Sequence, residues 1–105
     1  MTHLKLSEHI QVVFRYLKTI PKGSIVTYAL VAKQCRISNP RNIGWILQQN
    51  ADGDTIPCYK VVRSDGTLAG GYKFGGAAKQ KARLVADGVR FEPSGKIDLD
   101  KFLAK

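Results

Sequence analysis

The sequence predicts a mainly α-helical single small domain with a helix-turn-helix of the winged-helix-like kind and a short β segment or hairpin. Apolar residues recur at three- and four-residue spacings near the start of the chain, as in an amphipathic helix. Two short segments with helix start signals then follow each other across a tight turn. A brief apolar run leads into an Asp-Gly turn. With 105 residues and no linker-like stretch, residues 1–105 are expected to form one domain.

The first expected helix covers residues 6–20 and ends at Pro21. Its buried stripe consists of apolar residues at helical spacing: Ile10, Val13, Phe14 and Leu17. The second helix is expected to start after Thr27, whose hydroxyl suits an N-cap, and to run through Cys35.

The third expected helix follows a short turn and runs to about Gln49. Ser38 or Asn39 can cap it, because both side chains accept hydrogen bonds from free N–H groups at a helix start. Pro40 falls in its first turn, where a missing N–H removes no helical hydrogen bond.

Arg41 and Asn42 lie in the first turn of this third helix, where a helix inserted into a DNA groove meets the DNA. Helix-turn-helix pairs are also common as purely structural units. In most DNA-binding examples the second helix enters the major groove, but these residues leave insertion into the minor groove open.

The second half of the chain is expected to hold a glycine-rich loop at residues 70–76, either mobile or acting as a lid, and a helix at 77–87. Gly88 stands where a left-handed residue commonly ends a helix. The tail is expected to add a strand or turn at 89–91 and a short helix at 98–103.

Charge favours a polyanionic partner. Seventeen Lys and Arg residues against eight Asp and Glu give a net charge of +9, and neutralising phosphates releases counterions that drive association with nucleic acid. A solvated basic surface and ribosome-like RNA binding are the alternatives.

Apolar runs are far shorter than the ~20 residues of a membrane span, and no signal peptide is apparent. We therefore expect a cytoplasmic protein, or a nuclear one in a eukaryote, that does not bind membranes. We also expect it to act as a monomer.

The two cysteines, Cys35 and Cys58, are too few for a disulfide framework or a four-ligand zinc site, although a single bridge stays possible on sequence grounds. His3 and His9 stand far along the chain from other candidate ligands. We therefore expect free thiols, no metal and no cofactor.

Cys58 is the candidate nucleophile, within an apolar segment at residues 56–63. A lone cysteine in such a segment is often an inert core residue. A cysteine becomes reactive where cations stabilise its thiolate, and Lys60 and Arg63 follow closely. Cys35 lacks such neighbours and is expected to be structural.

Motifs spread over nearly the whole chain match one known family. In order they are Val13-Phe14-x-x-Leu17-x-x-Ile20-Pro21-x-Gly23-x-Ile25-Val26-Thr27-Tyr28-x-x-Val31-Ala32, Asn39-Pro40-Arg41-x-Ile43-Gly44, Asn50, Ile56-Pro57-Cys58-x-x-Val61-Val62, Gly71-Tyr72 and Leu84-x-x-Asp87-Gly88-Val89. The chain thereby resembles the C-terminal domain of the O6-alkylguanine-DNA alkyltransferases and their alkyltransferase-like relatives.

The resemblance implies how the chain would bind DNA. The helix that starts near Asn39 and Pro40 would lie in the minor groove, which replaces the major groove as our expectation. Arg41 would fill the gap left by a flipped guanine, with Asn42 beside it. Tyr28, which the residues alone favour as a core aromatic, would press on the phosphate and contact the base. Base flipping is needed because a thiol cannot reach the O6 substituent inside the stack.

The resemblance also implies a base pocket. The Cys58 and Val61 carbonyls would accept from the guanine amino group, and Leu47 and Tyr72 would give the apolar surface for stacking. The segment with Tyr72 and Lys73 would form the wall near O6.

The resemblance further implies that Asn50 would brace the turn between the DNA-binding helix and the active site. Cys58 would take the alkyl group once, as a stoichiometric repair agent for duplex DNA carrying O6-alkylguanine.

The chain departs from the family pattern beside Cys58. Tyr59 stands where the family has a histidine, Lys60 where it has an arginine, and Asp87 where it has a glutamate. We therefore expect the thiolate to depend on a helix dipole and on Lys60 or other cations, with Tyr59 donating a hydrogen bond to the sulfur or to a water.

Two alternatives to alkyl transfer remain. One is an alkyltransferase-like protein that binds the lesion and recruits excision-repair proteins; such relatives usually carry tryptophan in the cysteine position, so Cys58 favours transfer. The other is a plain DNA-binding helix-turn-helix protein in which Cys58 is a core residue.

Overall fold

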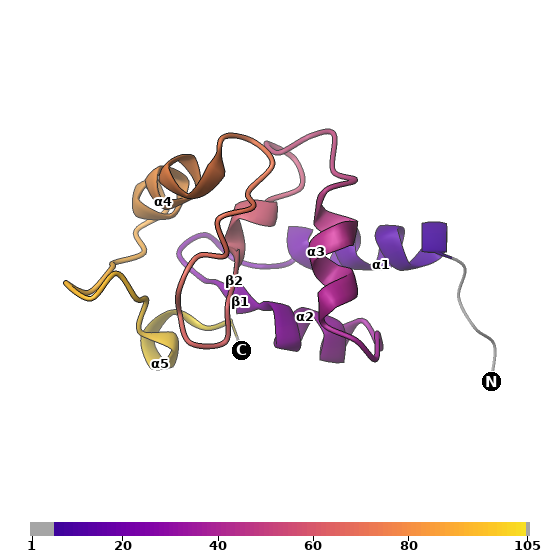
Figure 1. Cartoon of the computed structure of the whole chain (residues 1–105), viewed down its shortest axis with the longest axis horizontal. Coiled ribbons are helices and arrows are strands. Elements are labelled where there is room, and N and C mark those ends of the chain that lie inside the picture. The colour runs from indigo at the N-terminus through magenta and orange to yellow at the C-terminus, as the bar shows by residue number, and fades with distance from the viewer. Residues whose placement is uncertain (1–5, 105) are drawn as a thin grey trace.

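The computed structural model describes residues 6–104, so that His3 lies outside the described part. Figure 1 shows its helices arranged around a short β pair. The elements in chain order are α1 (Leu6–Lys18), β1 (Val26–Thr27), α2 (Tyr28–Gln34), α3 (Arg41–Leu47), the 3-10 helix η1 (Cys58–Lys60), β2 (Val61–Val62), α4 (Gly76–Ala86) and α5 (Leu99–Phe102). The predicted fold class is confirmed. Within residues 6–104, no helix has the length and apolar character needed to cross a membrane.

The helix-turn-helix forms where the sequence predicts it. Thr27 Oγ1 accepts a hydrogen bond from the Leu30 N–H at 3.0 Å and caps α2. Asn39 Oδ1 accepts one from the Arg41 N–H at 3.0 Å, but α3 begins only at Arg41 and its N-cap is Pro40, so the prediction that Ser38 or Asn39 is the cap and that Pro40 lies in the first turn is wrong by one to two residues. These local bonds fix the start of both helices.

Helices α1 and α3 each end two residues earlier than predicted, at Lys18 and Leu47. The chain continues in both places with hydrogen bonds to carbonyls three residues back, donated by the N–H groups of Thr19, Ile20, Gln49 and Asn50. Such tight turns satisfy the last carbonyls of a helix. Hydrophobic spacing cannot distinguish them from one more α-helical turn.

Strands β1 and β2 pair in parallel, with Val26 opposite Val61 and Thr27 opposite Val62. Strand β2 is the β segment that the sequence predicts. Strand β1 was not predicted, because two residues produce no alternating pattern and Thr27 reads as a helix cap. The preceding residue, Ile25, bonds to the C-terminal segment through both its N–H and its carbonyl, each at 2.8 Å.

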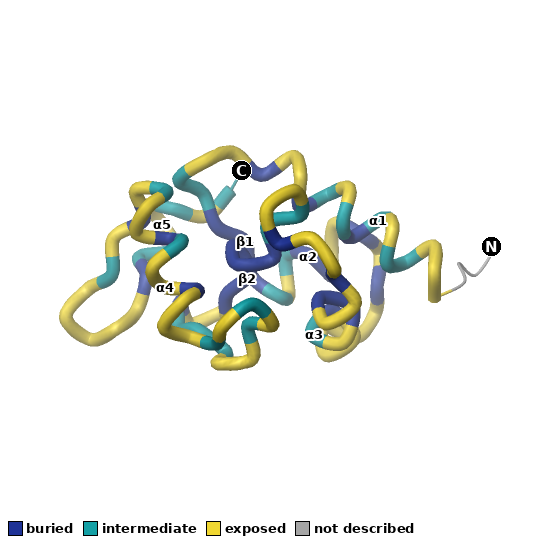
Figure 2. Tube along the Cα trace, turned by 90° about the horizontal axis from the view of Figure 1, so that it is seen from above, coloured by how far each residue is buried: buried dark blue, intermediate teal, exposed yellow. Residues whose placement is uncertain are grey.

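Both strands are buried, as the dark blue centre of Figure 2 shows. Their residues pack into two separate apolar clusters. Val26 and Val61 pack into the first cluster, together with buried residues of α1, α2 and α3. Ile25 and Val62 pack into the second cluster, with Leu84 of α4 and residues of the tail. Successive side chains of a strand point to opposite faces, so one short backbone segment supports both clusters.

Helix α4 ends as the sequence predicts, at Gly88, whose φ is 97°. The Gly88 N–H donates to the Val85 carbonyl and the Val89 N–H donates to the Leu84 carbonyl, both at 3.0 Å, which is the Schellman arrangement. Val89 and Leu84 also pack together in the second cluster. The predicted tail follows, with a bridge between Phe91 and Ile97 and then α5.

Replacing Gly88 tests this helix end. Gly88→Ala should lower the free energy of unfolding by about 1–2 kcal/mol, because an L side chain is disfavoured at this backbone conformation. A Cβ at Gly88 meets nothing within 4 Å, so the backbone alone sets the effect. Urea unfolding measures it.

The matched control is Gly44→Ala in α3, where a Cβ also meets nothing within 4 Å and φ is not positive. Alanine favours a helix interior, so this variant should gain about 0.5–1 kcal/mol. Equal stability changes in the two variants would contradict the account of Gly88.

Candidate active site

A cavity of about 470 Å³ opens between α3, η1 and the loop before α4. Its lining comes from five parts of the chain: Tyr28, Pro40, Arg41, Gly44, Leu47, Gln48, Cys58, Ala69, Gly71, Tyr72, Lys73 and Gln80. Among the predicted site residues, seven lie here: Tyr28, Pro40, Arg41, Leu47, Cys58, Tyr72 and Lys73. The other predicted residues lie outside the lining: Asn39, Asn42, Asn50, Tyr59, Val61 and Asp87.

Cys58 opens η1 and is 4% exposed. Burial raises the pKa of its thiol, while the Asn50 side chain, the backbone, Arg83 and Lys73 act in the opposite direction. The net pKa lies above the ordinary value, so the group is mainly a thiol at neutral pH. η1 is a single 3-10 turn of three residues, and the cations that act on the sulfur come from α4 and the loop before it.

Lys60 does not serve the sulfur, so the expectation that it stabilises the thiolate is wrong. Its Nζ donates to the Ile20 and Pro21 carbonyls at 2.8 and 3.0 Å and lies 4.0 Å from Asp87 Oδ2. The side chain is buried, and this burial lowers its pKa although Asp87 acts against it. Through these two hydrogen bonds Lys60 instead links η1 to the loop that follows α1.

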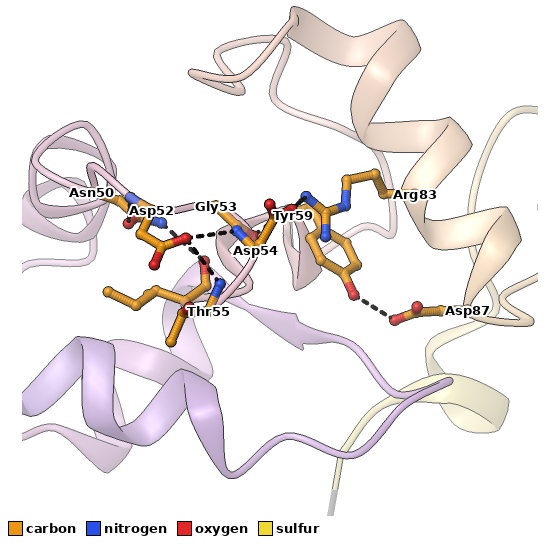
Figure 3. A network of polar contacts seen from close by, with 9 residues as sticks. Asn50, Asp52, Gly53, Asp54, Thr55, Tyr59, Arg83 and Asp87 are labelled. Carbon is orange, nitrogen blue, oxygen red and sulfur yellow. Dashed lines mark hydrogen bonds and ion pairs between the residues drawn. The ribbon is translucent and has the colours of Figure 1, made fainter.

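Tyr59 points away from Cys58. The two adjacent side chains belong to opposite clusters, with Cys58 in the first and Tyr59 in the second. The Tyr59 hydroxyl donates to Asp87 Oδ2 at 2.7 Å, and the Arg83 guanidinium carbon lies 4.5 Å from the ring centroid, as Figure 3 shows for this group. The expectation that Tyr59 donates to the sulfur is therefore wrong.

The Tyr59 phenol is a poor proton acceptor at neutral pH. Burial raises its pKa to about 12, with the hydrogen bond and the charge of Asp87 adding to the rise. Asp87 is nevertheless long enough to reach the residue that stands in the histidine position. Tyr59 and Asp87 are thus hydrogen-bonded to each other, and neither belongs to the cavity lining.

Asn50 is fully buried and ties the chain after α3 to the segment before Cys58. Its Nδ2 donates to the Ile56 carbonyl at 2.9 Å, and its Oδ1 accepts from the Asp52 N–H at 2.8 Å. Lys73 Nζ donates to the Asn50 carbonyl at 2.6 Å. One residue therefore links α3, the loop before α4 and the approach to Cys58.

Helix α3 presents a polar and cationic face beside the cavity mouth. Asn39, Pro40, Arg41 and Asn42 are all exposed, and α3 contains no acidic residue. Trp45, which the sequence analysis did not single out, is 48% exposed on the same helix. Its place four residues after Arg41 and outside the buried positions of α3 is the signal that identifies it.

Two further site residues were missed, and both belong to α4. Gln80 is buried in the cavity lining, and its Nε2 donates to the Tyr59 and Val61 carbonyls, each at 3.0 Å. Arg83 stacks on Tyr59 and acts on the sulfur. A polar residue four positions before the buried Leu84 is a signal for Gln80, whereas no local pattern indicates Arg83.

The cavity with the buried Cys58 thiol lies beside the exposed first turn of α3, the second helix of the helix-turn-helix. The family model of the DNA-binding domain of 6-O-methylguanine DNA methyltransferase matches residues 8–89. The chain belongs to this alkyltransferase family of DNA repair proteins.

Curated relatives of this chain carry three different names. The chain is 42% identical over 74 residues to a methylated-DNA–protein-cysteine methyltransferase of Pyrobaculum aerophilum. This alignment covers 70% of the chain and 48% of that protein. It is 32% identical over 93 residues to a DNA base-flipping protein of Escherichia coli, covering 88% and 70%. The match to a bifunctional methyltransferase/endonuclease of Picrophilus torridus, at 39% identity, covers 85% of the chain and 29% of that protein. The chain thus matches less than half the length of two of these relatives.

Solved structures show the same fold. Schizosaccharomyces pombe Atl1, in complex with damaged DNA containing O6-carboxymethylguanine, superposes with a TM-score of 0.85 at 25% identity and covers 97% of this chain and 99% of Atl1. Mycobacterium tuberculosis OGT in complex with DNA superposes with a TM-score of 0.73 at 29% identity, covering 82% and 52%.

Tyr59→Phe should lower the free energy of unfolding by about 1–3 kcal/mol, because the hydrogen bond to the Asp87 carboxylate is lost. The folded pKa of about 12 exceeds the unfolded value of about 10. The stabilisation is therefore complete below pH 10 and disappears as the pH rises from about 10 to 12. Urea unfolding of both proteins across this range should show a shrinking difference, and a constant difference would contradict it.

Proposed function

We propose that this chain extrudes O6-alkylguanine from duplex DNA into its cavity and transfers the alkyl group to Cys58. The observation that carries the proposal is the position of Cys58, a buried thiol lining a cavity whose mouth is bordered by the exposed face of α3. Family membership and the net charge of +9 support a DNA partner.

The DNA-binding step uses α3. We propose that α3 enters the minor groove and that Arg41 replaces the extruded base in the stack. Arg41 suits this role because it is exposed at the first position of α3 and also lines the cavity mouth. An inserted side chain offsets the free energy of unstacking, which is a few kcal/mol.

The base would lie between Tyr28 and the wall that Leu47 and Tyr72 form, with its O6 substituent toward Cys58. All four residues line one cavity. Val61 lies outside the lining, and its carbonyl accepts from Gln80. The Cys58 carbonyl likewise accepts one hydrogen bond, from the Val61 N–H, but Cys58 lines the cavity. Recognition of the guanine amino group would therefore fall to the second lone pair of the Cys58 carbonyl.

The transfer step needs no cofactor. The Cys58 thiol loses its proton to solvent, and the sulfur then attacks the alkyl carbon. The bond from that carbon to O6 breaks, its electron pair stays on guanine, and guanine takes up a proton from water. The product is a thioether, from which the alkyl group does not readily leave, so each protein molecule acts once. We propose further that the protein acts as a monomer, in the cytoplasm or, in a eukaryote, in the nucleus. Because burial raises the thiol pKa, the rate should keep rising with pH beyond the range in which an ordinary cysteine thiol ionises.

The second candidate is lesion binding without transfer, followed by recruitment of excision-repair proteins. The raised pKa of the Cys58 thiol favours it over rapid transfer. The superposition on Atl1, solved with O6-carboxymethylguanine DNA, also supports a lesion-binding protein.

Mass spectrometry separates the two candidates. Incubation with a duplex carrying O6-methylguanine should add one methyl group to the Cys58 peptide. Cys58→Ala should abolish the gain and keep binding within about twofold, since the α3 face is unchanged. Cys35→Ala, which removes the other free thiol, is the matched control and should still be methylated. Tight binding without a mass gain would exclude alkyl transfer and leave lesion binding as the function.

Binding itself is measured through Trp45, which is the one tryptophan of the sequence and is half-exposed on α3. Its fluorescence should change on titration with lesion duplex. Arg41→Ala should weaken binding roughly tenfold. Arg15→Ala removes the same charge from the exposed side of α1 and should have a smaller effect; equal losses in the two variants would contradict a specific role for Arg41.

A further inference from the structure

We propose that Gln48 is a positioning residue that holds one side of the cavity mouth in place, so that the helix proposed to bind DNA also sets how wide the cavity opens. That side is the rim segment, which consists of Ala69, Gly70 and Gly71. What the mouth would admit from DNA rests on the proposed function, whereas the contact that sets its width does not.

Helix α3 and the rim segment border the same cavity. Ala69 and Gly71 line it, and so do Arg41, Gly44 and Gln48. The last three positions are spaced by three and four residues, which places them on one face of the helix. The face of α3 that begins with Arg41 therefore ends at Gln48, opposite the rim segment.

A short hydrogen bond joins the two sides. Gln48 Nε2 donates to the Gly71 carbonyl at 2.7 Å, between residues 23 positions apart in the sequence. A Cβ at Gly71 would lie 4.0 Å from the same Nε2, so the amide lies directly against the backbone of the rim segment. Both residues are exposed. Water therefore competes for the two groups, and the bond can open without disturbing the core.

The rim segment has weak attachments otherwise. In residues 6–104 its other hydrogen bond joins Arg63 Nη2 to the Ala69 carbonyl at 3.5 Å, which is long for such a bond. Within the same residues, none of its three backbone N–H groups donates a hydrogen bond. Gly70 has a φ of 88°, and a Cβ there would meet nothing within 4 Å. Two adjacent glycines thus leave this backbone free to change conformation once Gln48 lets go.

The residues that follow the rim segment are anchored more firmly. The Tyr72 ring packs against both apolar clusters and lies edge-on to Phe74, with the ring centroids 5.7 Å apart. Lys73 Nζ donates to the Asn50 carbonyl at 2.6 Å. Loss of the Gln48 bond should therefore release the rim segment and leave the cavity wall that Tyr72 forms in place.

The contact connects DNA binding with access to the thiol. Under the proposed function, a base enters beside α3 with its O6 substituent toward Cys58, which is 4% exposed. An intact Gln48 bond keeps this entrance narrow, whereas a broken bond lets the rim segment move away from α3. Gln48 thereby limits the size of the group that reaches Cys58.

The test compares how fast two uncharged maleimides of different size, N-ethylmaleimide and N-(1-pyrenyl)maleimide, modify Cys58 at neutral pH. In both reactions the thiol adds across the maleimide double bond, so a change in the thiol pKa alters both rates equally and leaves their ratio unchanged. Gln48→Met keeps the length of the side chain and removes the donor. It should raise the rate of the larger reagent relative to the smaller one by about three- to tenfold, the factor for one lost hydrogen bond. Mass spectrometry of the Cys58 peptide gives both rates.

Gln49→Met is the matched control, because Gln49 Nε2 donates at 3.2 Å to the Trp45 carbonyl of its own helix. This variant should leave the ratio unchanged. Gln48→Lys restores a long donor and should return the ratio close to that of the unaltered protein. The Cys35 peptide is the reference for the whole fold, since this thiol is also 4% exposed, and its labelling should stay slow in every variant.

Three results would overturn the proposal: an unchanged ratio in Gln48→Met, an equal rise in Gln49→Met, or a ratio in Gln48→Lys as high as in Gln48→Met. Labelling of Cys35 that rises in step with Cys58 would overturn it as well, because the whole fold would then have loosened. Maleimide labelling needs no DNA, and methyl transfer from the lesion duplex is scored separately. Failure of the proposed function is thus distinguished from failure of this inference.

Discussion

The backbone pairing of β1 with β2 brings together the two halves of the molecule on which the site depends. Val26–Thr27 leads directly into α2, and Val61–Val62 follows directly from η1, so the helix-turn-helix and Cys58 share one connection. Side chains alternate between the two apolar clusters on either side of this connection. Just before β2, successive side chains of the 3-10 turn η1 are about 120° apart, and Cys58 packs in the first cluster whereas Tyr59 packs in the second.

The charged groups around the thiol follow from this separation of Cys58 from Tyr59. The polar groups next to Cys58 in sequence are engaged with other partners: Tyr59 with Asp87, and Lys60 with backbone carbonyls. The cations near the thiol come instead from α4 and the loop that precedes it. Burial still dominates and keeps the pKa of Cys58 high. The ionisation of the thiol therefore depends on how far the polar and cationic groups around it offset the desolvation.

The DNA-facing side depends on a different requirement, namely an exposed helix with no negative charge beside a cavity large enough for a base. Helix α3 has this character, and its buried residues anchor it against α1 and α2. Family relatives carry the names of both a cysteine methyltransferase and a base-flipping protein. Under the proposed function, extrusion uses α3 whereas transfer uses the thiol, so that a shared binding face with differing chemistry below it would account for both names.

The sequence by itself determined the approximate positions of the helices, the cap of α2, the left-handed end at Gly88 and the family, because these depend on local spacing, on side chains that bond to nearby backbone and on short motifs. It also indicated Cys58, Arg41, Leu47 and Tyr72, which the fold gathers at one cavity. Only the tertiary structure decided the partners of Tyr59 and Lys60 and the roles open to Gln80 and Arg83. Those contacts join residues about 20 to 40 positions apart, and which side of a two-residue strand a side chain occupies is set by the packing of two clusters, for which no local pattern exists.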